Sequence, residues 1–375
     1  MLFAPLALLL LSQTYVIDPS GAGDFTDLPQ AVAAAAPGDT LWLQPGQYSP
    51  TTIQKELTLI GPKLPTGFGV TATVASVGGQ GLVVDGVPGF TATNISLFDA
   101  ELRNITGRLR LDDVWVRNLE FTNCADIILT RSSVSSSSSS SPALLLDDSS
   151  IQIQETWVVN FSSSQFSGDA IWTRGAVDVL FVGGRIEGGS TPGYLPSEVP
   201  GAAFAILDGT LDLVLRGSSS DFIDSGGDWQ GFSGPVFKGT PASLVWSGIA
   251  KTLSSAFESV PAEPYIEIGP DHNESPVRRL RAFGPAGQPI FVVMTAPSSI
   301  AQPSPYAGEP IRVDLTQIYG QKLLTLQGQN THAAYSFGLP SGPSLVGASF
   351  DVQGVALMPA GELFVTNASQ VILIE

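Results

Sequence analysis

The stretch that decides the fold is "VIDPSGAGDFTDLPQAVAAAAPGDTLWLQPGQYS", which runs from Val16 to Ser49. It predicts a short strand, a glycine-rich turn, one brief helix and a second strand. Asp27 is a suitable N-cap for that helix, and Pro29 fits its first turn. The side chains that share one face of the helix are Leu28, Ala31, Val32 and Ala35. An amphipathic helix laid across the open apolar end of a coil of parallel strands would cap that end, as terminal caps do in solenoids.

This stretch resembles the opening of the pectin-lyase-like right-handed parallel β-helix superfamily. The segments that carry the resemblance are "GDFTDLPQAVAAAAPGDTLWLQPGQYS" and, shortly after it, "KELTLIG". The match is specific over about residues 15–61, loose to about residue 260 and absent afterwards. The resemblance implies a fold and no particular activity, because the same opening precedes lyases, esterases, hydrolases and non-enzymes.

The middle of the chain supports the same architecture through repetition. Short apolar runs that end in a polar turn recur as "LVVDG", "SLFDA", "LRLDD", "IILTR", "LLLDD", "AIWTR" and "AILDG". Such strands are too short for an ordinary sandwich, and no crossover helix separates them, so stacked rungs explain them best. The serine-rich run from Ser132 to Ser141 predicts either a flexible loop, which we favour, or the continuation of a rung.

The pattern changes near residue 260, where proline clusters and longer alternating strands begin. Both histidines of the chain, His272 and His332, lie in this part. We therefore expect an all-β protein with three parts: a signal peptide over residues 1–14, a right-handed parallel β-helix with an N-terminal capping helix over residues 15–261, and a small β-sandwich over residues 262–375.

Charge and hydropathy bound the partners and the compartment. The formal net charge is −17, which repels phosphate backbones and argues against nucleic acid as a partner. The same charge opposes the binding of polyuronates unless a local basic patch or a divalent cation intervenes. The opening "MLFAPLALLLLSQT" predicts export to the cell surface or the medium, with a buried first strand as the alternative. No segment is long enough to span a membrane.

The search for catalytic motifs finds no complete set. In the pectin-lyase-like superfamily, polygalacturonase-like members carry paired Asp and a Gly-His-Gly segment. In this chain no histidine occurs before residue 272. The chain also lacks a His-Glu-x-x-His zinc motif, a phosphate loop and a Gly-x-Ser-x-Gly elbow. Whether the protein is an enzyme is therefore left open by the motifs.

One candidate site is an acidic cluster in "SSSDFIDSGGDW", which contains Asp221, Asp224 and Asp228. The segment echoes the Asp-Phe-Ile-Phe-Gly motif of pectinesterase-like proteins, with Asp224 in place of the second aromatic. Three alternatives stand: a polar turn that closes a rung, a remnant of esterase chemistry, and a calcium site, because hard cations prefer carboxylate oxygens.

A second candidate is the stretch "RNITGRLRLDDVWVRN". Arg108 and Arg110 are two residues apart and share one face of a strand, beside Asp112 and Asp113. These four residues would suit a saccharide or lyase groove; the alternative is a solvated face with local salt bridges. Two functions follow: a non-catalytic surface protein that binds extracellular polysaccharide, or a divergent polysaccharide lyase or other carbohydrate-active enzyme.

Overall fold

The structure is a computed structural model of the whole chain, and its described part is almost entirely β, with a single helix. The described residues are 12–62, 72–75, 81–161, 168–190, 201–216, 222–224, 236–239, 241–247, 265–270, 277–283, 288–302, 307–308, 311–325, 332–338, 349–358 and 361–372.

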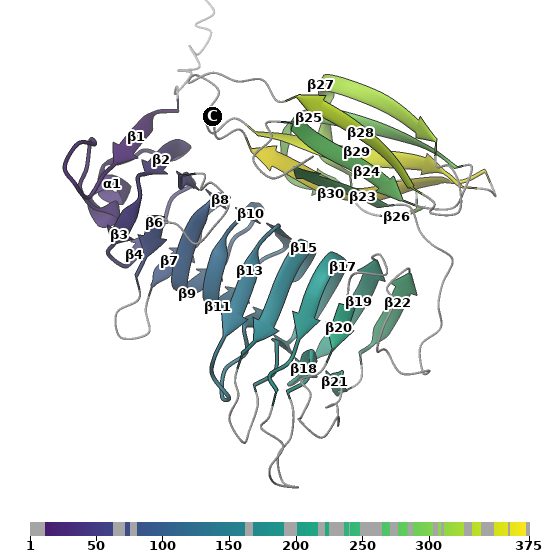
Figure 1. Cartoon of the computed structure of the whole chain (residues 1–375), viewed down its shortest axis with the longest axis horizontal. Coiled ribbons are helices and arrows are strands. Elements are labelled where there is room, and N and C mark those ends of the chain that lie inside the picture. Colours follow the sequence, from purple (N-terminus) through teal and green to yellow (C-terminus); the bar gives the residue numbers. More distant parts are fainter. Residues whose placement is uncertain are drawn as a thin grey trace, which may run out of the picture.

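The first 22 strands join into one parallel sheet that winds as a coil (Figure 1). Each strand pairs with strands one turn before and after it, so the coil has three parallel ladders. The first ladder stacks β1 (Thr14–Ile17), β2 (Asp39–Leu43), β5 (Leu57–Ile60), β8 (Phe90–Thr93), β10 (Arg108–Asp112), β12 (Asp126–Thr130), β15 (Ser150–Asn160), β17 (Ala176–Glu187), β19 (Thr210–Arg216) and β22 (Ser243–Ser247).

The second ladder lies beside the first. It stacks β3 (Gly46–Tyr48), β6 (Ala72–Val74), β9 (Ile95–Arg103), β11 (Trp115–Thr122), β13 (Ser133–Ser136), the second halves of β15 and β17, and β20 (Phe222–Asp224). The strand β13 falls within the serine-rich run, so a flexible loop is the wrong interpretation for Ser133–Ser136 and a rung is the right one.

The third ladder completes each turn. It stacks β4 (Thr51–Ile53), β7 (Leu82–Asp85), the second halves of β9 and β11, β14 (Leu144–Asp147), β16 (Ile171–Arg174), β18 (Phe204–Ile206) and β21 (Phe237–Lys238). Three ladders of parallel strands around one core are consistent with the expected parallel β-helix.

The core forms because alternate side chains of each strand point inward and stack on the same position of the next rung. On the first ladder, for example, buried Leu109 and Leu111 lie in register with Ile127 and Leu129. The chain turns between ladders at single residues with left-handed backbone, such as Asp99 (φ 56) and Asn118 (φ 59). Asn and Asp tolerate this conformation better than other non-glycine residues, which explains their recurrence at the corners.

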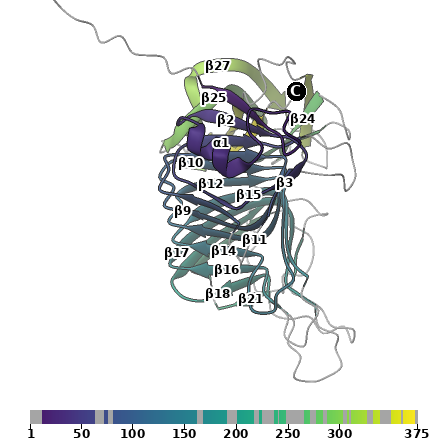
Figure 2. The same cartoon turned by 90° about the vertical axis from the view of Figure 1, so that its left-hand side faces the viewer.

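The helix α1 (Leu28–Ala34) lies at the N-terminal end of the coil, in front of the first strands in Figure 2. Asp27 is its N-cap, with an extended backbone and a carboxylate that accepts from Leu28 N at 2.8 Å and Ser49 N at 2.9 Å. Leu28, Ala31 and Val32 are buried in the same cluster as the core of the coil. That the helix acts as a cap stays a prediction.

Two further sheets form after residue 264. The three-stranded sheet is β23 (Tyr265–Pro270), β24 (Val277–Phe283) and β28 (His332–Gly338). The five-stranded sheet is ordered β26 (Ala307–Gly308), β30 (Leu363–Ile372), β29 (Ser349–Leu357), β25 (Pro289–Gln302) and β27 (Ile311–Thr325), antiparallel except between β26 and β30. One hydrophobic cluster contains residues of both sheets, although the sandwich itself stays a prediction.

The five-stranded sheet faces the outer side of the first ladder (Figure 1). Buried Asp351 of β29 contacts Arg108 and Arg110 of β10, and the guanidinium of Arg216 lies 5.6 Å from the ring centroid of Phe364 on β30. The first ladder is therefore covered by the C-terminal part along these rungs.

Candidate functional site

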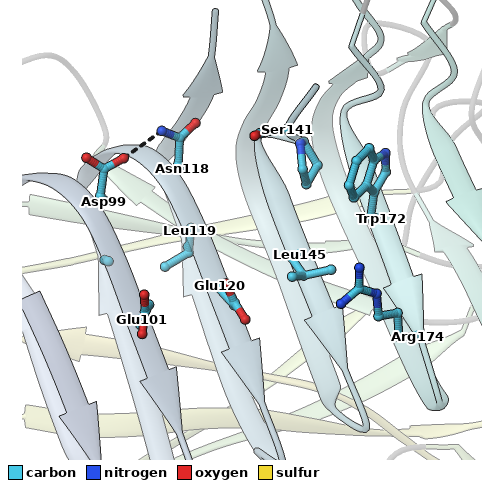
Figure 3. A pocket seen from close by; sticks show the side chains of 11 residues that line it. Asp99, Glu101, Asn118, Leu119, Glu120, Ser141, Leu145, Trp172 and Arg174 are labelled. Carbon is cyan, nitrogen blue, oxygen red and sulfur yellow. Dashed lines mark hydrogen bonds between the residues drawn. The ribbon is translucent and has the colours of Figure 1, made fainter. Parts of the chain in front are cut away.

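The candidate site is a groove of about 300 Å³ on the outer side of the third ladder. Its lining comes from four successive rungs and from the segment that precedes β14. The lining residues are Asp99, Ala100, Glu101, Asn118, Leu119, Glu120, Ser141, Pro142, Leu145, Trp172 and Arg174. Figure 3 shows the main side chains of this set on neighbouring strands.

Strand register places two carboxylates side by side in the groove. Glu101 on β9 is the direct partner of Glu120 on β11, which is in turn the partner of Leu145 on β14. Leu145 pairs with Trp172 on β16. Because neighbouring strands are about 4.8 Å apart, these four side chains form a row along the axis of the coil, with the acidic pair at one end and the indole at the other.

The environment of Glu120 favours its protonated form. Burial of this half-buried side chain raises the pKa of Glu120, and the neighbouring charges of Glu101 and Asp147 raise it further, against an opposing effect of Arg174. Glu120 is thus a carboxyl group that holds its proton to a higher pH than an ordinary glutamate, as a general acid requires.

Glu101 lies in a different setting from Glu120. Its Oε2 is 3.7 Å from Nη1 of Arg103, which also pairs with Asp85 at 3.3 Å between Nε and Oδ2. Two carboxyl groups with different partners, one inclined to keep a proton and one paired with a cation, are the arrangement that separates an acid from a nucleophile or base.

Trp172 provides an apolar wall of the groove, and a hydrogen bond to its indole fixes the orientation of the ring. Its indole Nε1 donates to Oδ2 of Asp169 at 3.0 Å. Buried Asp169 also accepts from Ala202 N at 2.7 Å and from Lys238 Nζ at 2.5 Å. An aromatic ring held in this way presents an apolar surface of the kind that packs against the C–H face of a sugar ring.

The corner between the second and third ladders forms one edge of the groove. Asn118 Nδ2 donates to Asp99 Oδ1 at 2.6 Å, and both residues have left-handed backbone. The hydrogen bond joins equivalent corners of two rungs, which fixes β9 and β11 relative to one another. The spacing of Glu101 and Glu120, two residues further along each strand, depends on this corner.

The residues predicted to line a saccharide groove lie elsewhere, on the first ladder. Arg108 is paired with Asp126 at 3.3 Å between Nε and Oδ2 and with Asp351, and Arg110 Nη2 is 3.5 Å from Asp351 Oδ2. Burial lowers the pKa of both arginines, that of Arg110 to about 9.

The two aspartates of that prediction differ in exposure. Asp112 is buried, accepts from Thr130 Oγ1 at 2.7 Å and pairs with Arg131, whereas Asp113 is an exposed corner with φ 52. Arg108, Arg110 and Asp112 are thus buried in this structure, and the two arginines contact the C-terminal sheet. Saccharide binding there stays a prediction.

The predicted acidic cluster falls mostly outside the described part of the chain. Asp221 and Asp228 are not among the described residues, and Asp224 is placed only through its backbone, which pairs with Glu187 on β17. Among the described residues, no group of three or more His, Cys, Asp or Glu side chains could hold a metal ion. The calcium site stays a prediction.

Reasoning from sequence motifs missed the acidic pair and the hydrogen bond from Trp172 to Asp169. A usable signal is present, since "AELR" and "NLEF" place a glutamate at the same position of two successive rungs. To use that signal, one must know which residues of successive rungs are register partners. The sequence does not show this, because the turns between strands differ in length. Trp172 and Arg174 lie two rungs beyond Glu120, and the serine-rich run stands between them and Glu120 in the sequence.

Comparisons with known proteins do not assign the chain to a family. No family model matches the chain, and no curated protein matches it. A solved structure of tailspike protein 2 from bacteriophage CBA120, its enzymatically active domain, is 10% identical with a TM-score of 0.19, and the match covers 92% of this chain and 67% of that one.

A second solved structure is tailspike protein gp49 from Acinetobacter baumannii bacteriophage Fri1, a capsular polysaccharide depolymerase. It is 8% identical with a TM-score of 0.15, and the match covers 87% of this chain and 78% of that one. At these values the likeness carries no argument about activity. The described part of the chain also contains no helix that is long and apolar enough to cross a membrane.

Proposed function

We propose that the groove on the third ladder binds a polysaccharide and hydrolyses a glycosidic bond within it. The observation that carries this proposal is the register pair of Glu101 and Glu120 on adjacent rungs, two rungs from Trp172. Two carboxyl groups that flank one bond, one protonated and one ionised, are what most glycoside hydrolases use.

In the proposed reaction Glu120 donates its proton to the glycosidic oxygen, so the leaving sugar departs as an alcohol. Glu101, as a carboxylate, either attacks the anomeric carbon or takes a proton from the water that attacks it. Trp172 holds a neighbouring sugar ring. Arg174, in register with Asp147 on the adjacent strand, lies at the same end of the groove and is suited to contact an anionic substituent.

The wider setting of this proposal is an exported protein. We infer a right-handed coil, because parallel strand crossovers are almost always right-handed, with α1 as its N-terminal cap and a C-terminal sandwich docked on the first ladder. A secreted or surface location gives the groove access to extracellular polysaccharide. The leader prediction rests on residues 1–14, of which residues 1–11 lie outside the described part and Thr14 begins β1.

The test is product analysis of the full chain with a panel of extracellular polysaccharides. Wild type is expected to release oligosaccharides with new reducing ends. Glu120→Gln removes the acid and Glu101→Gln removes the ionised carboxylate, and each is expected to lower turnover by at least about a hundredfold. Glu56→Gln, an exposed glutamate before the first-ladder strand β5, is the matched control and is expected to keep full activity.

Three results would overturn the proposal of hydrolysis. Unsaturated sugar products would identify a lyase instead. Binding that Trp172→Ala abolishes, with no product from any polymer, would identify a non-catalytic binding protein. Products that persist in the double variant Glu101→Gln with Glu120→Gln would place the chemistry outside this groove.

A further inference from the structure

Two tryptophans lie exposed on the outer side of the second ladder, around the corner from the groove. Trp115 on β11 is 39% exposed and Trp157 on β15 is 55% exposed. Both are direct register partners of Ser133 on β13, which lies between them. Large aromatic side chains left in water on adjacent parts of one face are the exception in a folded protein and mark a contact surface.

The spacing of these tryptophans suits an extended chain of sugars. Two rungs separate them, about 10 Å along the axis of the coil, and one sugar unit of an extended glycan advances by close to one rung. Ser133 has a small side chain, so it leaves room for a ring between the two indoles. The strands β11, β13 and β15 follow one another along the body in Figure 1.

Arginines accompany the tryptophans on the same face. Exposed Arg117 lies two residues after Trp115 on β11, and its guanidinium carbon is 5.4 Å from the ring centroid of Phe98. Phe98 also packs edge-on against Trp115, with ring centroids 5.3 Å apart. Arg185 on β17 is the register partner of Trp157 and pairs with Glu187. On a chain of net charge −17, Arg117 places an exposed cation beside aromatic rings on this face.

We propose that Trp115, Arg117, Ser133, Trp157 and Arg185, the tryptophan strip, form a second binding site for a carboxylated polysaccharide. The indoles stack on alternate sugar rings of the polysaccharide, and the exposed guanidinium of Arg117 binds a carboxylate of that polysaccharide. The site is independent of hydrolysis in the groove, because the corner at Asp99 and Asn118 separates the two faces. Its function is to hold a polymer along the coil.

The experiment measures binding of the full chain by affinity electrophoresis and calorimetry with three probes. Carboxymethyl cellulose and alginate are carboxylated, and hydroxyethyl cellulose is an uncharged polymer with the same backbone as the first. Wild type is expected to bind the carboxylated probes more tightly, with an affinity that falls as salt is added. Trp115→Ala with Trp157→Ala is expected to weaken binding about tenfold or more.

Further variants separate the components of the strip. Arg117→Gln is expected to weaken binding of the carboxylated probes and to leave hydroxyethyl cellulose unaffected. Tyr319 is an aromatic on β27 that is more exposed than either tryptophan. Tyr319→Ala is the control and is expected to bind as wild type does. Glu120→Gln is expected to keep strip binding, so failure of the strip and failure of the groove give different results. Circular dichroism and melting curves check that each variant is folded.

The proposal is overturned if the double tryptophan variant binds the carboxylated probes as wild type does, or if wild type binds none of the three probes. It is also overturned if the tryptophans are covered by a second copy of the chain. In that case, wild type would sediment as an oligomer, and Trp115→Ala with Trp157→Ala would sediment as a monomer.

Discussion

Arg110 of β10 and Asp351 of β29 meet across the body of the protein, 3.5 Å apart between Nη2 and Oδ2, although 241 positions separate them in the sequence. Arg108 contacts the same carboxylate, so one buried aspartate serves two buried arginines. Because desolvated charges need partners, this ion cluster ties the C-terminal sheet to one register on the first ladder. Arg108 and Arg110, which were predicted to line a saccharide groove, thus contact the C-terminal sheet, and saccharide binding at this face stays a prediction.

Loss of Asp351 is therefore expected to destabilise the whole protein. Asp351→Asn leaves two arginines buried without their shared counter-charge, and the expected loss of unfolding free energy is about 3 kcal/mol. Urea unfolding followed by tryptophan fluorescence measures it. Asp113→Asn is the control, since this corner carboxylate is exposed and Asn tolerates its left-handed backbone. An equal effect of both substitutions would contradict the role of the ion cluster.

The raised pKa of Glu120 predicts a pH-dependent gain of stability in Glu120→Gln. Because burial raises the folded-state pKa above the unfolded value, wild type loses stability as pH rises through that interval, while the neutral amide does not. The variant is expected to melt higher than wild type at neutral pH and at the same temperature at low pH. Melting curves across a pH series decide this, and a difference that does not change with pH would contradict it.

Coupling between the two groove carboxylates is measurable without any substrate. The charge of Glu101 contributes to the raised pKa of Glu120, whereas Arg174 opposes it. Glu101→Gln is expected to lower the pKa of Glu120, and Arg174→Gln is expected to raise it further. Carbon NMR titration of labelled glutamate carboxyls follows both shifts. Shifts of the same sign in the two variants would show that the groove electrostatics differ from those described.

Asp169 is expected to control the affinity of the groove through Trp172. Asp169→Asn exchanges a carboxylate for an amide that accepts from fewer of its three donors, Trp172, Ala202 and Lys238. The indole gains freedom, and oligosaccharide binding is expected to weaken several-fold, with a shift in tryptophan emission. Asp208→Asn serves as the control because exposed Asp208 accepts from Gly175 N in a neighbouring turn. Equal affinities in both variants would exclude a positioning role.

At the corner residue Asn118, the effect of the left-handed backbone on stability can be measured separately from that of the side-chain hydrogen bond. Asn118→Ala and Asn118→Gly both remove the hydrogen bond to Asp99, but only alanine opposes the left-handed backbone. The alanine variant is expected to be less stable than the glycine variant by about 1 kcal/mol. Thermal unfolding of the pair gives the difference, and equal stabilities would mean that the corner relaxes.

The ladder architecture was predictable from sequence because each rung contributes an apolar run and a polar turn. The opening stretch even identified Asp27 as the N-cap and the apolar face of α1. The groove was not predictable, because it depends on which residues of different rungs become neighbours. Asp99 and Asn118 are 19 positions apart, as are Glu101 and Glu120, but the next rungs of the third ladder follow longer and unequal intervals.

Contacts between distant parts were still harder to foresee. Arg108 and Arg110 carry the alternation of an exposed strand face, and nothing near them in sequence indicates that Asp351 covers them. Strand patterns report which side chains leave the core of the coil. They do not show whether those side chains contact water or a second sheet. That depends on how the C-terminal part packs on the coil.

The serine-rich strand β13 has one inward anchor near its centre, Val134, which is fully buried in register with Val116 and Val158. The serines after it lead directly to Ser141 and Pro142, which form part of the groove wall. Buried Asn160 of β15 donates from Nδ2 to the backbone oxygens of Ser138 and Ser141, which fixes the path of the tract. The groove wall at Ser141 and Pro142 is therefore positioned from the second ladder, by Val134 of β13 and by Asn160 of β15.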